Sequence, residues 1–243
     1  MIDEWKKGAK YWTKAWNPVI GCRKISEGCQ NCYAESMIKR FKSLCNKSGD
    51  FLPHSAGKLR NPPKTGIVFV GNMTDIFGDW NTNEQVCSWI NRLNAATINL
   101  ILTKRAPRLF HLSHNILQYN RFYGITAENQ SCLDERYYAL VNFRRKWLSL
   151  EPLLGEIKLD DAFLQFKPDW IVVGAESGTN KRPCKIEWIE SIVEQCRKAG
   201  VKVFVKQLDI NGKLVNDINK FPEHLQIRQV PWHENNKIDK TME

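Results

Sequence analysis

The 243-residue sequence alternates short apolar runs with amphipathic stretches. The runs are continuous, four or five residues long and rich in β-branched residues. This pattern favours buried parallel strands over strands that have one face in water. The predicted strands are Trp16–Ile20, Ile67–Val70, Asn99–Thr103, Phe122–Ile125, Trp147–Leu150, Trp170–Val173 and Val201–Val205.

Two intervening stretches have the i, i+3, i+4, i+7 apolar spacing of an amphipathic helix, one from Ala34 to Phe41 and one from Ile189 to Cys196. Gly200 is a typical end signal for the second helix. Strands that alternate with helices predict an α/β fold, with about six or seven parallel strands and helices outside them. A complete or partial (β/α) barrel and an open doubly wound sheet all fit this pattern.

The chain is predicted to form a single domain over residues 1–243, with its core at about 11–208. A long loop is expected at 42–64, where Gly, Pro and Ser are frequent, and a tail at 231–243. The first residues contain no apolar segment typical of a signal peptide. No apolar run reaches the roughly 18 residues of a membrane span. We therefore expect a cytoplasmic protein that does not enter a membrane.

The net charge of +10 is concentrated near the start of the chain. Residues 1–66 contain 13 Lys and Arg against 5 Asp and Glu, whereas residues 67–243 contain 23 against 21. The basic segment also carries aromatic residues such as Tyr11, Trp12 and Tyr33. Positive charge with interleaved aromatic rings is typical of nucleic-acid-binding surfaces. A solvated basic surface with its aromatic rings in the core is the alternative interpretation.

Three of the eight cysteines are clustered, in the spacing Cys22-x6-Cys29-x2-Cys32. Without a secretory signal, we expect reduced thiols. Soft thiolates select iron–sulfur clusters or zinc. Three cysteines can hold a [4Fe–4S] cluster with one iron left open, whereas structural zinc takes four ligands and would need His54 or Cys45 as well. Cysteines without any metal are the third possibility.

Polar side chains follow most of the predicted strands. Because the carboxyl ends of parallel strands meet at one edge, these side chains are expected to line one ligand pocket. Loops are polar in any case, and that accounts for some of the positions. The candidates are Asn72, Thr74, Asp75, Lys104, Arg105, Glu128, Glu151, Glu176, Ser177 and Lys206.

Six motifs carry a resemblance to a known family. They are WNPVIGCRKISEGCQNCYAE, GNMTDIF, ILTKRAPRL, WLSLEPLLG, VVGAESG and VFVKQ. Together they resemble a largely uncharacterised, phage-associated family that is similar to radical S-adenosylmethionine (SAM) enzymes, with spore photoproduct lyase among the nearer relatives. The resemblance extends from about Tyr11 to Leu208.

The resemblance implies a radical-SAM-like partial barrel in which Cys22, Cys29 and Cys32 hold a [4Fe–4S] cluster and SAM chelates its open iron. Reductive cleavage of SAM would give methionine and a 5′-deoxyadenosyl radical. Cofactor binding is then expected from Asn72, Thr74, Asp75, Lys104, Arg105, Glu176 and Ser177. Catalytic roles are expected from Glu128, Glu151 and Lys206. This chain has six residues between the first two cysteines, where the commonest pattern has three, and Asn31 stands where an aromatic residue is usual.

These features predict a radical SAM enzyme that modifies or repairs a base in a nucleic acid or nucleotide. Such an enzyme would need an electron donor such as flavodoxin or ferredoxin. The alternative is a zinc- or cluster-stabilised protein that binds nucleic acid or recruits a partner without catalysis.

Overall fold

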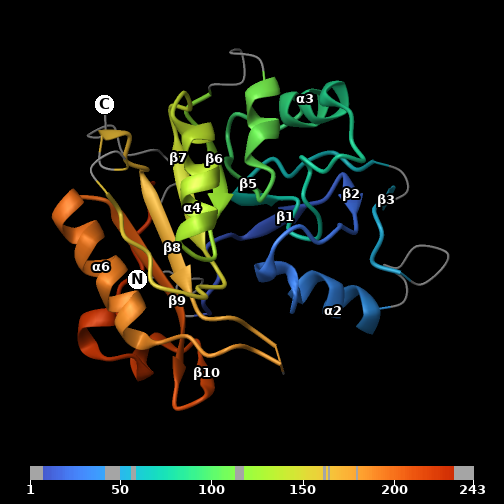
Figure 1. Ribbon diagram of the computed structural model, residues 1–243. Helices are drawn as coiled ribbons and strands as arrows, with labels where there is room; N and C mark the ends of the chain where they lie inside the picture. Colours follow the sequence, from blue (N-terminus) through green and yellow to red (C-terminus); the bar gives the residue numbers. More distant parts are fainter. Residues whose placement is uncertain are drawn as a thin grey trace.

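The computed structural model describes residues 8–41, 50–55, 59–112, 118–160, 163, 165–178 and 180–232 (Figure 1). Within these residues, eight strands form one mixed sheet in the order β1-β4-β5-β6-β7-β8-β9-β10. All neighbouring pairs are parallel except β9 and β10. The strands are β1 (Lys14–Trp16), β4 (Ile67–Val70), β5 (Ile98–Thr103), β6 (Arg121–Thr126), β7 (Lys146–Leu150), β8 (Trp170–Gly174), β9 (Lys202–Ile210) and β10 (Lys213–Val215).

The first predicted strand, Trp16–Ile20, is wrong as a single element. The chain leaves the main sheet after Trp16, and Val19–Ile20 forms β2, which pairs antiparallel with β3 (His54–Ser55). Pro18 explains the break, because proline has no N–H group to continue a ladder. The other six predicted strands are present, but β9 continues five residues beyond the predicted end, to Ile210, and β3 and β10 were not predicted.

The two predicted helices are confirmed as α2 (Tyr33–Arg40) and α6 (Ile186–Ala199). Gly200 ends α6 in the left-handed conformation, with φ of 66°. The remaining α-helices of the described residues are α3 (Asn83–Asn91) and α4 (Gln130–Arg136). Short 3-10 helices are η1 (Glu27–Cys29), η3 (Ala106–His111), η5 (Tyr137–Leu140), η6 (Ile218–Lys220) and η7 (Glu223–Leu225).

Helices α3, α4 and α6 cover the outer face of the sheet (Figure 1). Alternate strand residues such as Val68 and Ile171 pack there against Ile90 of α3, Leu133 of α4 and Ile192 of α6. Strands buried on both faces explain the continuous apolar runs in the sequence. The α/β prediction is therefore confirmed.

The inner face of the sheet curves around the ring of Tyr11. A flat sheet would separate β4 from β9, five strand spacings away in the sheet order, by about 24 Å. The Tyr11 ring nevertheless lies 6.2 Å from Phe69 of β4 and 5.6 Å from Phe204 of β9. The sheet is strongly bent but not closed, since β1 and β10 remain unpaired edges within the described chain. A complete barrel is therefore excluded for this part of the protein.

The packed structure continues beyond the predicted end of the core at Leu208. Trp232 is buried, with its ring 5.2 Å from Trp170 and 5.6 Å from Phe122. The prediction of a frayed tail from residue 231 is therefore wrong for Trp232, and residues 233–243 lie outside the described chain. None of the described helices is both long and apolar enough to cross a bilayer.

Candidate functional site

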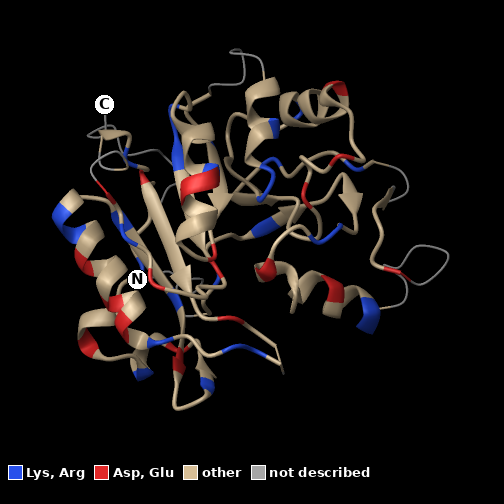
Figure 2. Ribbon diagram, viewed as in Figure 1, with Lys and Arg blue, Asp and Glu red and all other residues tan. Residues whose placement is uncertain are grey.

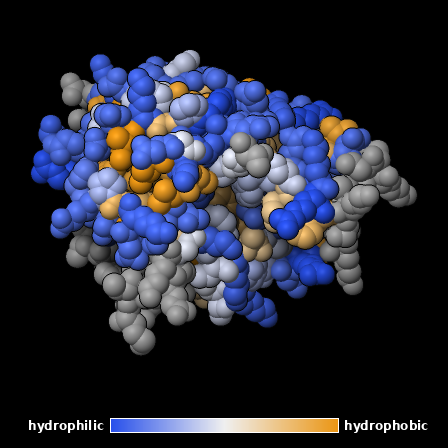
Figure 3. All heavy atoms as spheres, turned by 90° about the horizontal axis from the view of Figure 1, so that it is seen from below, coloured by the Kyte–Doolittle hydropathy of each residue, from blue (hydrophilic) through white to orange (hydrophobic). Residues whose placement is uncertain are grey.

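One cavity opens where the carboxyl ends of the parallel strands meet. Its volume is about 220 Å³, and it is open to solvent. Figure 3 shows the face toward which these strand ends point, mostly hydrophilic and hollowed near its centre. Twelve of the thirteen residues predicted for the site line this cavity: Cys22, Cys29, Cys32, Asn72, Thr74, Asp75, Lys104, Arg105, Glu151, Glu176, Ser177 and Lys206. Glu128 does not line it and lies fully buried.

The three cysteines belong to a loop, residues 21–32, that is anchored first to the end of β4. The Thr74 hydroxyl donates to the Gly21 carbonyl at 2.6 Å, and the Gly21 N–H donates to the Met73 carbonyl at 3.1 Å. Gly21 has φ of 89°, and a Cβ there would lie 2.3 Å from the Leu52 carbonyl oxygen. Only glycine fits this entry to the cysteine loop.

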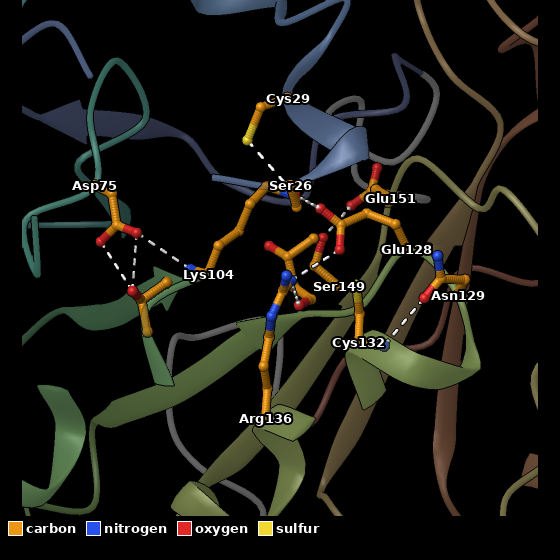
Figure 4. A network of polar contacts seen from close by, with 12 residues as sticks. Ser26, Cys29, Asp75, Lys104, Glu128, Asn129, Cys132, Arg136, Ser149 and Glu151 are labelled. Carbon is orange, nitrogen blue, oxygen red and sulfur yellow. Dashed lines mark hydrogen bonds and ion pairs between the residues drawn. The ribbon is translucent and has the colours of Figure 1, made fainter. Parts of the chain in front are cut away.

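The second anchor is Glu128, directly after β6 (Figure 4). Its Oε1 accepts a 2.5 Å hydrogen bond from Ser26 and pairs with the Lys104 ammonium, while Oε2 accepts from Arg136 at 2.8 Å. Burial opposes ionisation of Glu128, but Lys104, Ser26 and Arg136 outweigh it and lower the pKa to about 2. A Cβ on Gly28 would lie 2.3 Å from Glu128 Cγ, so the cysteine loop rests directly on this carboxylate side chain.

The third anchor is Glu176, directly after β8. Arg182 binds its carboxylate with two guanidinium nitrogens, at 2.9 and 2.5 Å. Asn31 donates to Glu176 Oε2 at 3.0 Å and to the Asn180 carbonyl at 2.8 Å, and Arg182 also reaches Glu27 at 3.2 Å. Although burial opposes it, Arg182 and Asn31 lower the pKa of Glu176. These hydrogen bonds and ion pairs attach the Cys29–Cys32 segment to the loop after β8.

Asp75 and Arg105 hold the remaining side of the loop. The Asp75 carboxylate accepts 2.9 Å bonds from the Thr103 hydroxyl and pairs with Arg105 at 3.2 Å. Arg105 also donates to the Arg23 carbonyl at 2.9 Å and lies 4.7 Å from the Trp80 ring centre. Residues that follow β4 and β5 thus support the backbone next to Cys22.

The three thiols are free, partly exposed and close enough to affect one another. Burial raises the pKa of Cys22 to about 11, and the charges of Asp75 and Cys29 add to this effect. Burial also raises the pKa of Cys32. At Cys29, Lys104 and hydrogen bonds from Ser26 and nearby backbone outweigh burial and lower the pKa. Lys104 is therefore the cation that favours a thiolate at this edge of the cavity.

The described residues contain no group of three or more His, Cys, Asp or Glu side chains arranged to hold a metal ion. Four ligands on one zinc ion bring sulfur atoms within about 4 Å of each other. Cys22, Cys29 and Cys32 all line the same cavity. His54 lies outside the cavity lining and its Nδ1 bonds the Leu52 carbonyl at 2.9 Å, while Cys45 is not among the described residues.

The inner end of the cavity is built on Glu151 and Lys206, which form a 2.6 Å ion pair. The other carboxylate oxygen of Glu151 accepts hydrogen bonds from Tyr11 and Ser149, both at 3.2 Å. Burial, with the Glu151 charge, raises the pKa of Tyr11 well above its usual value, so the phenol stays protonated and donates to Glu151. The end of β7 and the middle of β9 thus meet the residues that precede β1.

Several residues of the site were missed by the sequence analysis. Ser26, Asn31, Arg136 and Arg182 make the anchors described above, and Tyr11 reaches the cavity from the segment before β1. Arg136 had a usable signal, since it lies two helical turns after Glu128. Arg182 had none, because its loop has no regular spacing relative to the cysteines.

A protein-family model described as a protein of unknown function (DUF5131) matches residues 7–229. The chain belongs to this family. Comparison of this DUF5131 protein with curated proteins and with solved structures found no match. The expectation of an uncharacterised family is confirmed at that level. The phage association and the similarity to radical SAM enzymes stay predictions.

Basic residues of the DUF5131 protein lie at more than one end of the molecule (Figure 2). Arg23 and Lys24 belong to the cysteine loop, but Lys14 lies at the opposite, amino end of β1, where it bonds Thr65 at 2.7 Å. The positive charge of the first quarter of the sequence is therefore only partly gathered near the cavity.

Proposed function

We propose that this DUF5131 protein is a radical SAM-type iron–sulfur enzyme of a phage-associated family, acting on a nucleic acid or nucleotide in base modification or repair. One observation carries the proposal. The thiols of Cys22, Cys29 and Cys32 open onto the same cavity as polar side chains from the ends of β4, β5, β7 and β8 and from the middle of β9. The bent, open parallel sheet agrees with a radical-SAM-like partial barrel.

The donor set fits a [4Fe–4S] cluster better than a single zinc ion. Three thiols are the soft ligands that such a cluster takes, and Lys104 next to Cys29 would favour its negative charge. The cavity is larger than a site for one ion and has room for an organic ligand beside the thiols. When bound, the cluster would supply the electron that cleaves SAM into methionine and a 5′-deoxyadenosyl radical.

The protein's own residues would then bind and orient the ligands. Asn72 and Thr74, after β4, lie beside the cysteine loop and would face the amino group of SAM. Ser177, after β8, lines the side of the cavity next to Asn31. Glu151, held by Tyr11 and Lys206, would accept a hydrogen bond from a ligand at the inner end. Glu128 lies beneath the cavity, so we assign it the role of positioning the cysteine loop.

The test is anaerobic reconstitution with iron and sulfide, followed by reduction in the presence of SAM. We expect a brown protein with about four irons per chain that releases 5′-deoxyadenosine and methionine, measured by mass spectrometry. Cys29→Ala should lose the cluster and the product. Cys196→Ala, on the buried face of α6, is the matched control and should keep both.

A colourless protein that takes up one zinc per chain and keeps its fold in air would overturn the proposal. It would favour the zinc-stabilised, non-catalytic alternative. If the protein is brown but releases no 5′-deoxyadenosine under reduction, the cluster part of the proposal stands and the SAM cleavage is wrong.

A further inference from the structure

The inner end of the cavity has features of a second binding place, separate from the cysteine loop. We infer that it binds the ring of an uncharged nucleobase, with Trp12 as the stacking surface and the Glu151–Lys206 pair as the hydrogen-bonding edge. This inference rests on the proposed function for its context, but it concerns substrate class and can be tested without a cluster.

The aromatic side of this subsite comes from the segment that precedes β1. Trp12 packs edge-on against Tyr11 at 4.9 Å and against Phe69 at 5.1 Å. Tyr11 and Phe69 are buried, whereas Trp12 is only partly buried, and all three line the cavity. Trp12 is therefore the accessible ring of the group, held in place by its two neighbours. Stacking of a base on one aromatic ring contributes roughly 1–3 kcal/mol.

The polar side presents a donor and an acceptor next to each other. Lys206 pairs with Glu151 Oε1 at 2.6 Å and lies 5.7 Å from the Tyr11 ring centre, and an ammonium has three donors. Glu151 Oε2 accepts from Tyr11 and Ser149, and a carboxylate offers about four acceptor positions. Lys206 is the more accessible partner, with 24% of its side chain exposed, against 11% for Glu151, whose Oε1 is buried. A base edge with an N–H next to a carbonyl or ring nitrogen complements this pair.

The charge balance favours a neutral ligand. At the inner end the charge of Glu151 is paired with that of Lys206. An unpaired charge brought to the inner end would lose hydration without gaining a partner. A nucleobase ring is neutral, whereas its phosphate is not, so the phosphate would remain toward the mouth.

The base could come from the substrate or from the adenine of SAM, and the test separates the two. Cluster-free protein is titrated with adenosine, guanosine, cytidine, thymidine and SAM by calorimetry and tryptophan fluorescence. We expect at least one nucleoside other than adenosine to bind and SAM not to displace it. The 5′-monophosphate should bind within about threefold of its nucleoside.

Substitutions test which residues form the nucleobase site. Trp12→Ala should weaken nucleoside binding at least tenfold and Trp12→Phe less than threefold, with unchanged circular dichroism for the Phe variant. Lys206→Met should change the order of preference among the bases. Trp188→Phe, on α6 outside the cavity, is the control and should bind as the natural protein does.

Two results would overturn the inference. One is that no nucleoside binds the folded protein, or that binding is unchanged in Trp12→Ala and Lys206→Met. The other is that only adenosine binds and SAM displaces it, which would assign the ring site to SAM. Because the titration needs neither iron nor reductant, failure to release 5′-deoxyadenosine would leave a positive result standing.

Discussion

Asn31 donates a 3.0 Å hydrogen bond to Glu176, a residue 145 positions away in the sequence. Asn31 stands between Cys29 and Cys32, and Glu176 directly follows β8. The contact therefore ties the cysteine loop to the far side of the cavity through protein atoms alone. Together with the anchors at Gly21 and Glu128, it attaches the loop to the strand ends at three places.

Arg182→Ala should weaken the attachment of the cysteine loop to Glu176. The guanidinium makes a bidentate bond to a buried Glu176 carboxylate, and charge-assisted bonds of this kind contribute about 1.5–3 kcal/mol. We expect a loss of about 1–2 kcal/mol in urea unfolding, reduced because Arg182 is partly exposed, and faster hydrogen exchange in residues 27–32. Arg197→Ala, which breaks an exposed pair with Glu194, is the control and should leave the stability nearly unchanged. Equal effects of the two variants would contradict a role of Arg182 in attaching the cysteine loop.

Gly28→Ala should displace the cysteine loop. The added methyl group would lie 2.3 Å from Glu128 Cγ and cannot be accommodated without movement. We expect a loss of roughly 1–3 kcal/mol, the usual cost of overpacking, together with weaker iron uptake. Gly8→Ala is the matched control, since nothing lies within 4 Å of its Cβ. If Gly28→Ala unfolds at the same denaturant concentration as Gly8→Ala, the close contact with Glu128 is wrong.

Glu128→Gln should destabilise the fold at neutral pH. The substitution keeps the shape but removes the charge that faces Lys104 and Arg136, and Arg136 is buried. Breaking a buried ion pair typically costs about 3–5 kcal/mol, and Lys104 can partly recover by reaching solvent. We expect a loss of about 3 kcal/mol in chemical unfolding at pH 7. Glu135→Gln, on the exposed side of α4, serves as the comparison and should be close to neutral.

The natural protein and the Glu128→Gln variant should also differ in how their stability depends on pH. The folded-state pKa of Glu128 is about 2, below the value of about 4.3 for an unfolded glutamate. A lowered carboxyl pKa stabilises the fold above pH 4.3, and this contribution is lost as the pH falls toward 2. The stability difference between the natural protein and Glu128→Gln should therefore be constant from pH 7 to about 5 and shrink below that. A difference that grows on acidification would contradict the assignment.

Trp232→Ala should show that the C-terminal segment is part of the core. Its ring is buried against Trp170 and Phe122, and removal of a buried tryptophan costs about 3–5 kcal/mol. Phe110→Ala removes an exposed ring and should cost much less. Thermal unfolding of the two variants measures the contrast, and similar melting temperatures would mean that residue 232 does not support the sheet.

The sequence predicted the strands and the lining of the cavity because both depend on local pattern. Continuous apolar runs identify strands buried on both faces, and parallel strands bring their ends together whatever the loops do. The break at Pro18 and the short β10 were missed, since two- and three-residue strands leave little periodicity. Glu128 was expected in the cavity, but its buried position is explained by Arg136 nearby and by Ser26, which is distant in the sequence.

The segment that carries Tyr11 and Trp12 contributes no strand of its own, yet it fills the hollow of the sheet and forms the base of the cavity. The residues that set the depth and shape of the cavity are therefore different from those that anchor the cysteine loop. A change at Trp12 can remodel what the cavity accepts while β4 to β9 and the loop anchors stay as they are. The fold thus allows ligand choice to change through a few residues before β1 while the cysteine loop stays the same.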